Sequence, residues 1–167
     1  MFPVGLLNDA AVLLDQLRDR KLKLVAAESC TGGLISALFT EIAGSSDVIE
    51  RGFVTYSNAA KNEMLDVPED MLASHGAVSG PVARAMAQGA LRHSQADVAV
   101  AVTGVAGPGG GSAAKPVGLV HIAAARNNGE VLHRECRFGD IGRGPVRIAS
   151  VEVALQLVAG IIAAPPP

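Results

Sequence analysis

Apolar and polar positions alternate along the first twenty residues at the spacing of an amphipathic helix. Apolar side chains recur every three or four residues, while Asp9, Asp15 and Arg18 fall on the opposite side. This stripe predicts a helix of about four turns that buries one face against the rest of the chain. Its apolar members are Leu6, Leu7, Ala10, Leu13, Leu14 and Leu17.

The chain then changes to apolar runs of strand length. Residues 22–27 are mostly aliphatic and residues 53–56 are aromatic and β-branched, and both runs predict strands. Residues 97–102 (DVAVAV) are almost continuously apolar, as in a strand that is buried on both faces of a central sheet. Residues 117–125 and 130–138 predict two more strands, because the Asn-Asn-Gly turn between them is typical of a β-hairpin.

Segments with helical spacing separate these strands. Each follows a residue that favours a helix start. The predicted starts are Thr31, Asn58, Pro68, Ser79 and Pro145. Helices thus alternate with strands early, and a hairpin comes late. This order predicts an α/β fold, a three-layer α/β/α sandwich with a mixed, mainly parallel sheet.

No internal repeat or linker divides the chain. We therefore expect residues 1–167 to form a single domain. Residues 164–167 should be a tail, because three consecutive prolines cannot extend the closing helix.

Composition excludes several classes of partner. The chain is 49% hydrophobic, has a formal net charge of −2 and contains no run of lysine and arginine. Only 3% of its residues are aromatic. A nucleic-acid partner is not expected, because such a chain offers neither a basic patch nor a base-stacking platform. The histidines and cysteines lack the spacing of a zinc site, so we expect no metal and no cofactor.

The same sequence bears on location. No uninterrupted apolar run approaches the roughly 18–20 residues that cross a bilayer. No basic segment precedes Arg18, as it would in a signal peptide. Cys30 and Cys136 lie far apart and are expected to stay reduced. We therefore expect a soluble cytoplasmic protein without membrane contact, and the apolar closing helix favours self-association as a homo-oligomer.

The first candidate for chemistry is Ser29, where the first strand turns sharply and the helix predicted at Thr31 begins. A hydroxyl there lies beside the unpaired backbone N–H groups of a helix start, including those of Gly32 and Gly33. Such groups hold a phosphate or the oxyanion of an acyl transfer. A plain helix cap at Ser29 or Thr31 explains the same residues equally well.

A glycine-rich loop follows the central strand. Residues 103–111 contain five glycines in nine positions, a composition that lets backbone N–H groups approach an anion closely. The loop matches neither a Walker A motif nor a dinucleotide fingerprint. We interpret it as a cradle for a phosphate or sugar-phosphate, the alternative being a flexible turn without function.

A third candidate lies at the end of the second strand. Tyr56 closes the strand, Asn58 suits a helix cap, and Lys61 lies one turn further on. The positive end of the helix dipole and burial would lower the pKa of Lys61 and leave neutral amine available as a base. An exposed surface lysine is the alternative.

These pieces combine into a hypothesis of nucleophilic catalysis. Ser29 would be the nucleophile, Lys61 its base, and Tyr56 would pass or steady the proton. The Gly32 and Gly33 backbone would form the oxyanion hole. A serine–lysine pair needs no metal and suits a chain whose histidines have no obvious serine partner.

Several motifs together resemble the CinA C-terminal domain family of nicotinamide-nucleotide amidohydrolases, also called NMN deamidases. The resemblance covers residues from about 5 to 160 and includes a GD…VR segment that ends at Arg147. The other motifs are AAESCTGG at 26–33, GSSDVIERGFVTYSNAAK at 44–61, HGAVSGPVA at 75–83, TGVAGPGGG at 103–111 and KPVGLV at 115–120.

The resemblance implies metal-free hydrolysis of nicotinamide mononucleotide (NMN) to nicotinic acid mononucleotide and ammonia, a step of pyridine nucleotide recycling. It implies that Ser29 and Lys61 form the catalytic pair and that Tyr56 assists. The second large domain to which this one is often fused is absent, so its pyrophosphatase activity is not expected. The resemblance implies that Gly104, Gly107, Gly110 and Gly111 line the nucleotide site, with Arg147 nearby. The full set of substrate-binding residues that we expect is Thr31, Gly32, Gly33, Ser57, Asn58, Thr103, Gly104, Ala106, Gly107, Gly110, Gly111 and Arg147.

Two other interpretations stay open on the sequence. The chain would be a catalytically silent nucleotide-binding or interaction module if the pocket is kept without turnover, because a fold does not certify a function. It would be an amidase for a related pyridine nucleotide if the pocket differs in detail. The loop at 139–145 looks slightly longer than in the family pattern, which leaves the role of Arg143 open.

Overall fold

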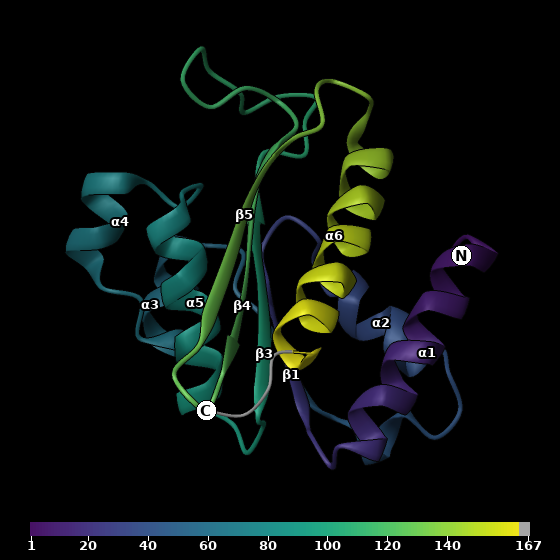
Figure 1. The fold of residues 1–167 in the computed structure, drawn as a ribbon. Helices are drawn as coiled ribbons and strands as arrows, with labels where there is room; N and C mark the ends of the chain where they lie inside the picture. Colours follow the sequence, from purple (N-terminus) through teal and green to yellow (C-terminus); the bar gives the residue numbers. More distant parts are fainter. Residues whose placement is uncertain (164–167) are drawn as a thin grey trace.

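The computed structural model describes residues 1–163, in which helices cover both faces of a five-stranded sheet (Figure 1). The predicted tail at 164–167 lies outside the described residues. The strands are β1 (Leu24–Glu28), β2 (Ile49–Val54), β3 (Val98–Gly104), β4 (Leu119–Arg126) and β5 (Val131–Arg137). The helices are α1 (Val4–Asp19), α2 (Leu34–Thr40), α3 (Asn58–Leu65), α4 (Glu69–His75), α5 (Gly80–Arg92) and α6 (Arg143–Ala163), with a 3₁₀ turn at Ser45–Asp47.

The sheet is mixed, as predicted, with the strand order β2-β1-β3-β4-β5. β1 pairs in parallel with β2 and β3, whereas β3–β4 and β4–β5 are antiparallel. Parallel and antiparallel pairs are equal in number, because the chain returns from β3 to β4 through a loop and not through a helix. The carboxyl ends of β1, β2 and β3 therefore lie at the same edge of the sheet.

Two hydrophobic clusters, one on each face of the sheet, confirm the predicted three layers. α1, α2 and α6 cover one face and α3, α4 and α5 cover the other (Figure 1). Valine, leucine and isoleucine dominate the first face of the strands, and alanine dominates the second. The small side chains let α5 lie close to the sheet, and Gly89 lets it approach α3, because a Cβ at Gly89 would clash with the Leu65 backbone.

Some boundaries differ from the sequence prediction. The second strand covers Ile49–Val54 and ends before Tyr56. α2 begins at Leu34 and not at Thr31, because Gly32 and Gly33 adopt positive φ angles of 57° and 97° that break the helix. The cap of α3 is Ser57, whose hydroxyl accepts a hydrogen bond from the Ala60 N–H at 3.0 Å, and Asn58 is the first helical residue.

α6 starts at Arg143, two residues before the predicted start. By length and composition alone this apolar 21-residue helix could cross a membrane. It packs against the sheet, and its buried side chains belong to the hydrophobic core on that face. Arg143 and Arg147 lie on its first two turns, where α6 approaches the carboxyl ends of the strands.

Candidate active site

A cavity of about 300 Å³ opens at the carboxyl ends of β1 and β3. Ligands in open α/β sheets bind at this edge. Side chains from several separate segments meet there, so the cavity is a product of the tertiary fold. Its lining residues are Ser29, Cys30, Tyr56, Lys61, Ala77, Val78, Thr103, Gly104, Val105, Ala106, Gly107, Gly109, Gly110 and Arg143.

Ser29 and Lys61 are in direct contact inside this cavity. The Lys61 Nζ lies 3.0 Å from the Ser29 Oγ and 2.8 Å from the Thr55 carbonyl oxygen, to which it donates. Lys61 is only 1% exposed, and among the described ion pairs none involves it. Burial lowers the pKa of its amine. A neutral amine that donates one N–H to Thr55 can accept the proton of Ser29.

The turn that carries Ser29 is fixed by its backbone. The Ser29 N–H donates to the Val102 carbonyl at 2.9 Å, which ties the turn to β3. From the other side, Arg147 donates to the carbonyl oxygens of Cys30 and Thr31 at 3.1 and 2.8 Å. The family resemblance implies a substrate contact for Arg147, but here its guanidinium holds the turn and lies outside the cavity lining.

The predicted oxyanion hole at Gly32 and Gly33 does not fit the structure. The Gly32 N–H donates to the Ser29 carbonyl at 3.0 Å, and the Gly33 N–H donates to the Glu28 carboxylate at 3.1 Å. Both groups are therefore already paired. Cys30, Ala106 and Gly107 line the cavity, and within residues 1–163 their N–H groups form no hydrogen bond to another residue.

Sequence reasoning missed Glu28. Its side chain is completely buried and accepts hydrogen bonds at the start of α2. A charged residue that ends an otherwise apolar strand, directly before the candidate nucleophile, was the available signal. Such a carboxylate needs hydrogen-bond donors, and the nearest unpaired donors are those of the following helix start.

The glycine loop at 103–111 lies along the cavity, but its glycines serve different purposes. Gly107 and Gly110 line the cavity with positive φ angles of 80° and 82°. Gly111 lies outside the lining, where a Cβ would meet the Val117 backbone at 2.9 Å. Thr103 is buried and donates through Oγ1 to the Ala77 carbonyl at 2.8 Å, which holds the neighbouring wall in place.

Arg143, which the sequence left open, lies at the cavity mouth. It donates to the Gly107 carbonyl at 2.8 Å and to the Tyr56 hydroxyl at 2.9 Å. Tyr56 is 62% exposed, and the structure gives it no hydrogen bond to Ser29 or Lys61. No contact in the structure therefore supports the predicted role of Tyr56 in passing the proton. Arg143 instead joins the Tyr56 hydroxyl to the glycine loop.

Several other predicted binding residues lie outside the cavity lining. Ser57 caps α3, and Asn58 lines a separate shallow depression between α3 and α4. Thr31 is buried, and its Oγ1 has no partner among residues 1–163. The predicted residues outside the lining are Thr31, Gly32, Gly33, Ser57, Asn58, Gly111 and Arg147.

Cys30 also lines the cavity, next to Ser29. Burial raises the pKa of its thiol to about 11, so at neutral pH it carries a proton and is a poor nucleophile. Both Cys30 and Cys136 are free and buried. Within residues 1–163, no three histidine, cysteine or acidic side chains lie together as a possible metal site.

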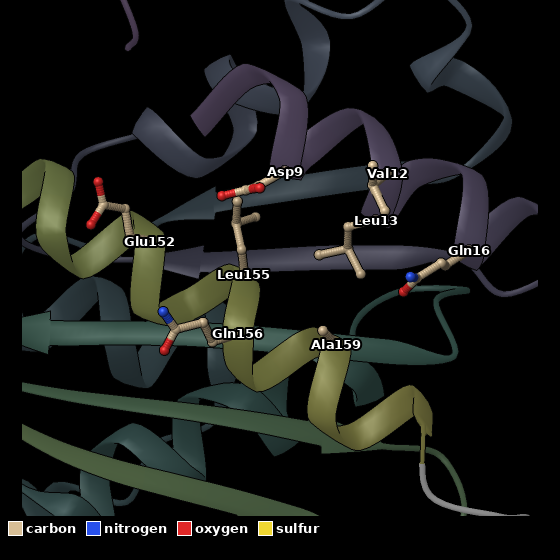
Figure 2. Close-up of a pocket in the computed structure, with 8 residues that line it drawn as sticks. All are labelled: Asp9, Val12, Leu13, Gln16, Glu152, Leu155, Gln156 and Ala159. Carbon is tan, nitrogen blue, oxygen red and sulfur yellow. The ribbon is translucent and has the colours of Figure 1, made fainter. Parts of the chain in front are cut away.

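A second hollow, of about 320 Å³, lies between α1 and α6 (Figure 2). Aliphatic side chains such as Leu13 and Leu155 form its floor, and Asp9 and Glu152 lie at its border. Its lining contains no nucleophile beside a base. The cavity around Ser29 and Lys61 is therefore the candidate active site.

Comparisons with known proteins agree with this architecture. The family profile described as the CinA C-terminal domain matches residues 8–162. The nicotinamide-nucleotide amidohydrolase PncC of Escherichia coli K12 is 52% identical over 141 residues, which cover 84% of this chain and 84% of that protein. A CinA-like protein of Synechococcus sp. RCC307 is 53% identical over 150 residues, which cover 89% of this chain and 36% of that protein.

A solved structure has nearly the same fold. The competence/damage inducible protein CihA from Agrobacterium tumefaciens superposes with a TM-score of 0.96 at 52% identity, covering 98% of this chain and 99% of that one. The chain spans about a third of the length of several curated relatives that it matches, with shares of 31–36%.

Proposed function

This chain belongs to the CinA C-terminal domain family, and we propose that it is an amidohydrolase that converts NMN and water to nicotinic acid mononucleotide and ammonia. The observation that carries the proposal is the buried contact of 3.0 Å between Lys61 Nζ and Ser29 Oγ. The 52% identity to a named nicotinamide-nucleotide amidohydrolase selects the substrate class. Such a reaction belongs to pyridine nucleotide recycling.

The first half-reaction forms an acyl-enzyme. The Ser29 Oγ attacks the carboxamide carbon as neutral Lys61 takes the hydroxyl proton. The tetrahedral intermediate collapses when the protonated lysine gives that proton to the departing nitrogen. The carbon–nitrogen bond breaks, ammonia leaves, and an ester joins the nicotinoyl group to Ser29.

The second half-reaction uses the same base. Lys61, neutral again, takes a proton from a water molecule that attacks the ester carbon. The carbon–oxygen bond to Ser29 breaks, and Lys61 returns a proton to the serine oxygen. The acid product leaves with the enzyme restored, and no metal is needed at any step.

Unpaired backbone groups suit the two anionic parts of the reaction. Cys30, Ala106 and Gly107 line the cavity together with Ser29, and within residues 1–163 their N–H groups bond no other residue, so we assign the oxyanion of the intermediate to them. Gly109 and Gly110 also line the cavity, with N–H groups that form no hydrogen bond within residues 1–163, and the exposed Arg143 supplies a positive charge. We assign the substrate phosphate to this part, which we call the outer cavity.

Ammonia release from NMN tests the proposal. Purified protein incubated with NMN should produce ammonia and nicotinic acid mononucleotide in equal amounts. The competing function, a silent nucleotide-binding module, has one supporting observation: several of the predicted contacts lie outside the cavity. NMN that binds, as followed by calorimetry, without ammonia release would favour that module.

Comparison of substrates locates the phosphate site. Nicotinamide riboside lacks the phosphate, so its kcat/KM should fall at least about tenfold below that of NMN, the loss of one charge-assisted contact. NAD carries a second nucleotide, and the same assay shows whether the cavity mouth admits it. Equal kcat/KM for riboside and NMN would contradict the assignment of the outer cavity to phosphate.

Arg143→Ala should weaken substrate binding more than chemistry. Its guanidinium joins Tyr56 to the Gly107 carbonyl and does not contact Ser29 or Lys61. We expect KM for NMN to rise by about tenfold with kcat changed less than about threefold, as for lost uniform binding. Arg134→Ala is the matched control, because Arg134 is exposed on β5 and bonds Gln156. A fall in kcat alone would assign Arg143 to the chemical step.

Location and assembly remain predictions of the sequence. We propose a cytoplasmic enzyme, since its two cysteines are free and buried. We also propose self-association as a homo-oligomer, because the closing helix is apolar. The proposed absence of nucleic-acid and membrane partners rests on the composition of the chain.

A further inference from the structure

The carboxylate of Glu28 is buried directly before the turn that carries Ser29, and within residues 1–163 it has no cationic partner. Glu28 has no exposed surface, and none of the described ion pairs includes it. Burying an ionised carboxylate is costly unless hydrogen bonds compensate it. The hydrogen bonds of the Glu28 carboxylate must therefore offset the cost of burying it.

Those contacts all lie at the start of α2. Oε2 accepts hydrogen bonds from the N–H groups of Gly33 and Ile35, at 3.1 and 3.0 Å. Oε1 accepts from the N–H and the hydroxyl of Ser36, both at 3.0 Å. The carboxylate thus occupies the positive end of the helix, where a negative charge is stabilised.

The backbone of Glu28 connects these hydrogen bonds to both members of the catalytic pair, Ser29 and Lys61. Ser29 follows it in sequence. The Glu28 carbonyl accepts the Thr55 N–H at 2.8 Å, and the Thr55 carbonyl accepts a hydrogen bond from Lys61 Nζ at 2.8 Å. Gly32 and Gly33 have positive φ angles, and the turn has only two short-range backbone hydrogen bonds of its own, from the Gly32 N–H to the Ser29 carbonyl and from the Leu34 N–H to the Thr31 carbonyl. The bonds to Glu28 and Thr55 add to these.

We propose that Glu28 is a positioning residue: its carboxylate ties the start of α2 to β1 and so holds the Ser29 hydroxyl within reach of Lys61. This inference rests on the proposed role of Ser29. A glutamine cannot replace the carboxylate, because its amide group has a single acceptor oxygen and would turn an N–H donor toward the donors of α2. A small displacement of a nucleophile is enough to cost about a hundredfold in rate.

A fluorophosphonate probe tests the inference without NMN. The Ser29 Oγ forms a bond to phosphorus, fluoride leaves, and Lys61 receives the hydroxyl proton. We expect the labelling rate constant of Glu28→Gln to fall at least about tenfold. Its pH midpoint should be unchanged, because Glu28 does not contact Lys61. Labelling is followed to completion, so that the rate constant is separated from the folded fraction.

Leu14→Ala is the matched control for lost stability. Leu14 is buried in α1, and its truncation destabilises the fold without touching the turn. Its labelling rate constant should equal that of the wild type. If Glu28→Gln labels as fast as the wild type, the inference about Glu28 is overturned, but the proposed function is not. A wild type that neither labels nor releases ammonia overturns the proposed function and this inference with it.

Ser36 and Gly52 give a second route that does not alter the buried charge. Ser36→Ala removes one of the four bonds to Glu28, and labelling should slow about threefold. Gly52→Ala should slow it too, because a Cβ at Gly52 would clash with Ser36 Oγ. The double variant lacks the Ser36 hydroxyl, so the new Cβ at position 52 has nothing to clash with. Gly52→Ala should therefore slow labelling no further than Ser36→Ala alone. Wild-type rates in both single variants, or additive effects in the double variant, overturn the inference even if Glu28→Gln fails to fold.

Discussion

Ser29→Ala is expected to abolish ammonia release from NMN, with kcat lowered by at least about a thousandfold. The hydroxyl is the group that bonds to the carboxamide carbon, and the neighbouring Cys30 cannot replace it, because burial raises the pKa of its thiol to about 11. The Oγ is 3.0 Å from Lys61 Nζ and makes no contact that holds the fold. The variant should therefore stay folded and bind NMN, which calorimetry and circular dichroism will check.

Ser74→Ala is the control for this experiment. Ser74 is exposed on α4 and donates only to backbone carbonyls of its own helix. It should keep wild-type turnover. Normal ammonia release by Ser29→Ala would rule out the acyl-enzyme mechanism and favour direct attack of water on the bound substrate.

Lys61→Met is expected to lower kcat by about 10²- to 10⁴-fold, the usual contribution of a general base, with NMN affinity retained. Methionine keeps the length and the buried volume but offers no lone pair of comparable basicity. Arginine at this position should not restore turnover, because a guanidinium stays protonated. Lys23→Met, on an exposed lysine at the other end of β1, is the control. Unchanged turnover in Lys61→Met would exclude the lysine as base.

The pH dependence follows from the same group. Burial lowers the pKa of Lys61 below 10.5, and the neutral amine is the active form, so kcat/KM should rise with pH through that lowered pKa and then level off. Between the lowered pKa and 10.5 the unfolded chain binds more protons than the folded one. The free energy of unfolding should therefore increase with pH across this window, and Lys61→Met should remove that slope.

Much of the fold could be predicted because its signals are local. The apolar run of β3 and the Asn-Asn-Gly hairpin turn each depend on a few neighbouring residues. The predicted strand at residues 53–56 begins after the observed start of β2 at Ile49, because Glu50, Arg51 and Gly52 interrupt the apolar pattern. These residues lie on an edge strand, where one side of the backbone is unpaired and charged side chains reach solvent.

The site was harder to predict from the sequence, because it depends on which residues pair with each polar group in the folded chain. Unpaired N–H groups at the start of α2 were expected to bind a ligand, but Glu28 fills that position from the adjacent strand. Arg143 and Arg147 are four residues apart on one helix and look equivalent in sequence. Their different contacts depend on where α6 begins relative to the cavity, which only tertiary packing determines.

The central claim is that a neutral Lys61 activates the Ser29 hydroxyl, and the pH profile of fluorophosphonate labelling tests it most directly. In the wild type, the rate constant for labelling Ser29 should increase with pH and then level off. The midpoint of this increase should lie below 10.5, the ordinary pKa of lysine. Lys61→Met should label slowly and show no such midpoint. The same rate and the same profile in both proteins would contradict the account.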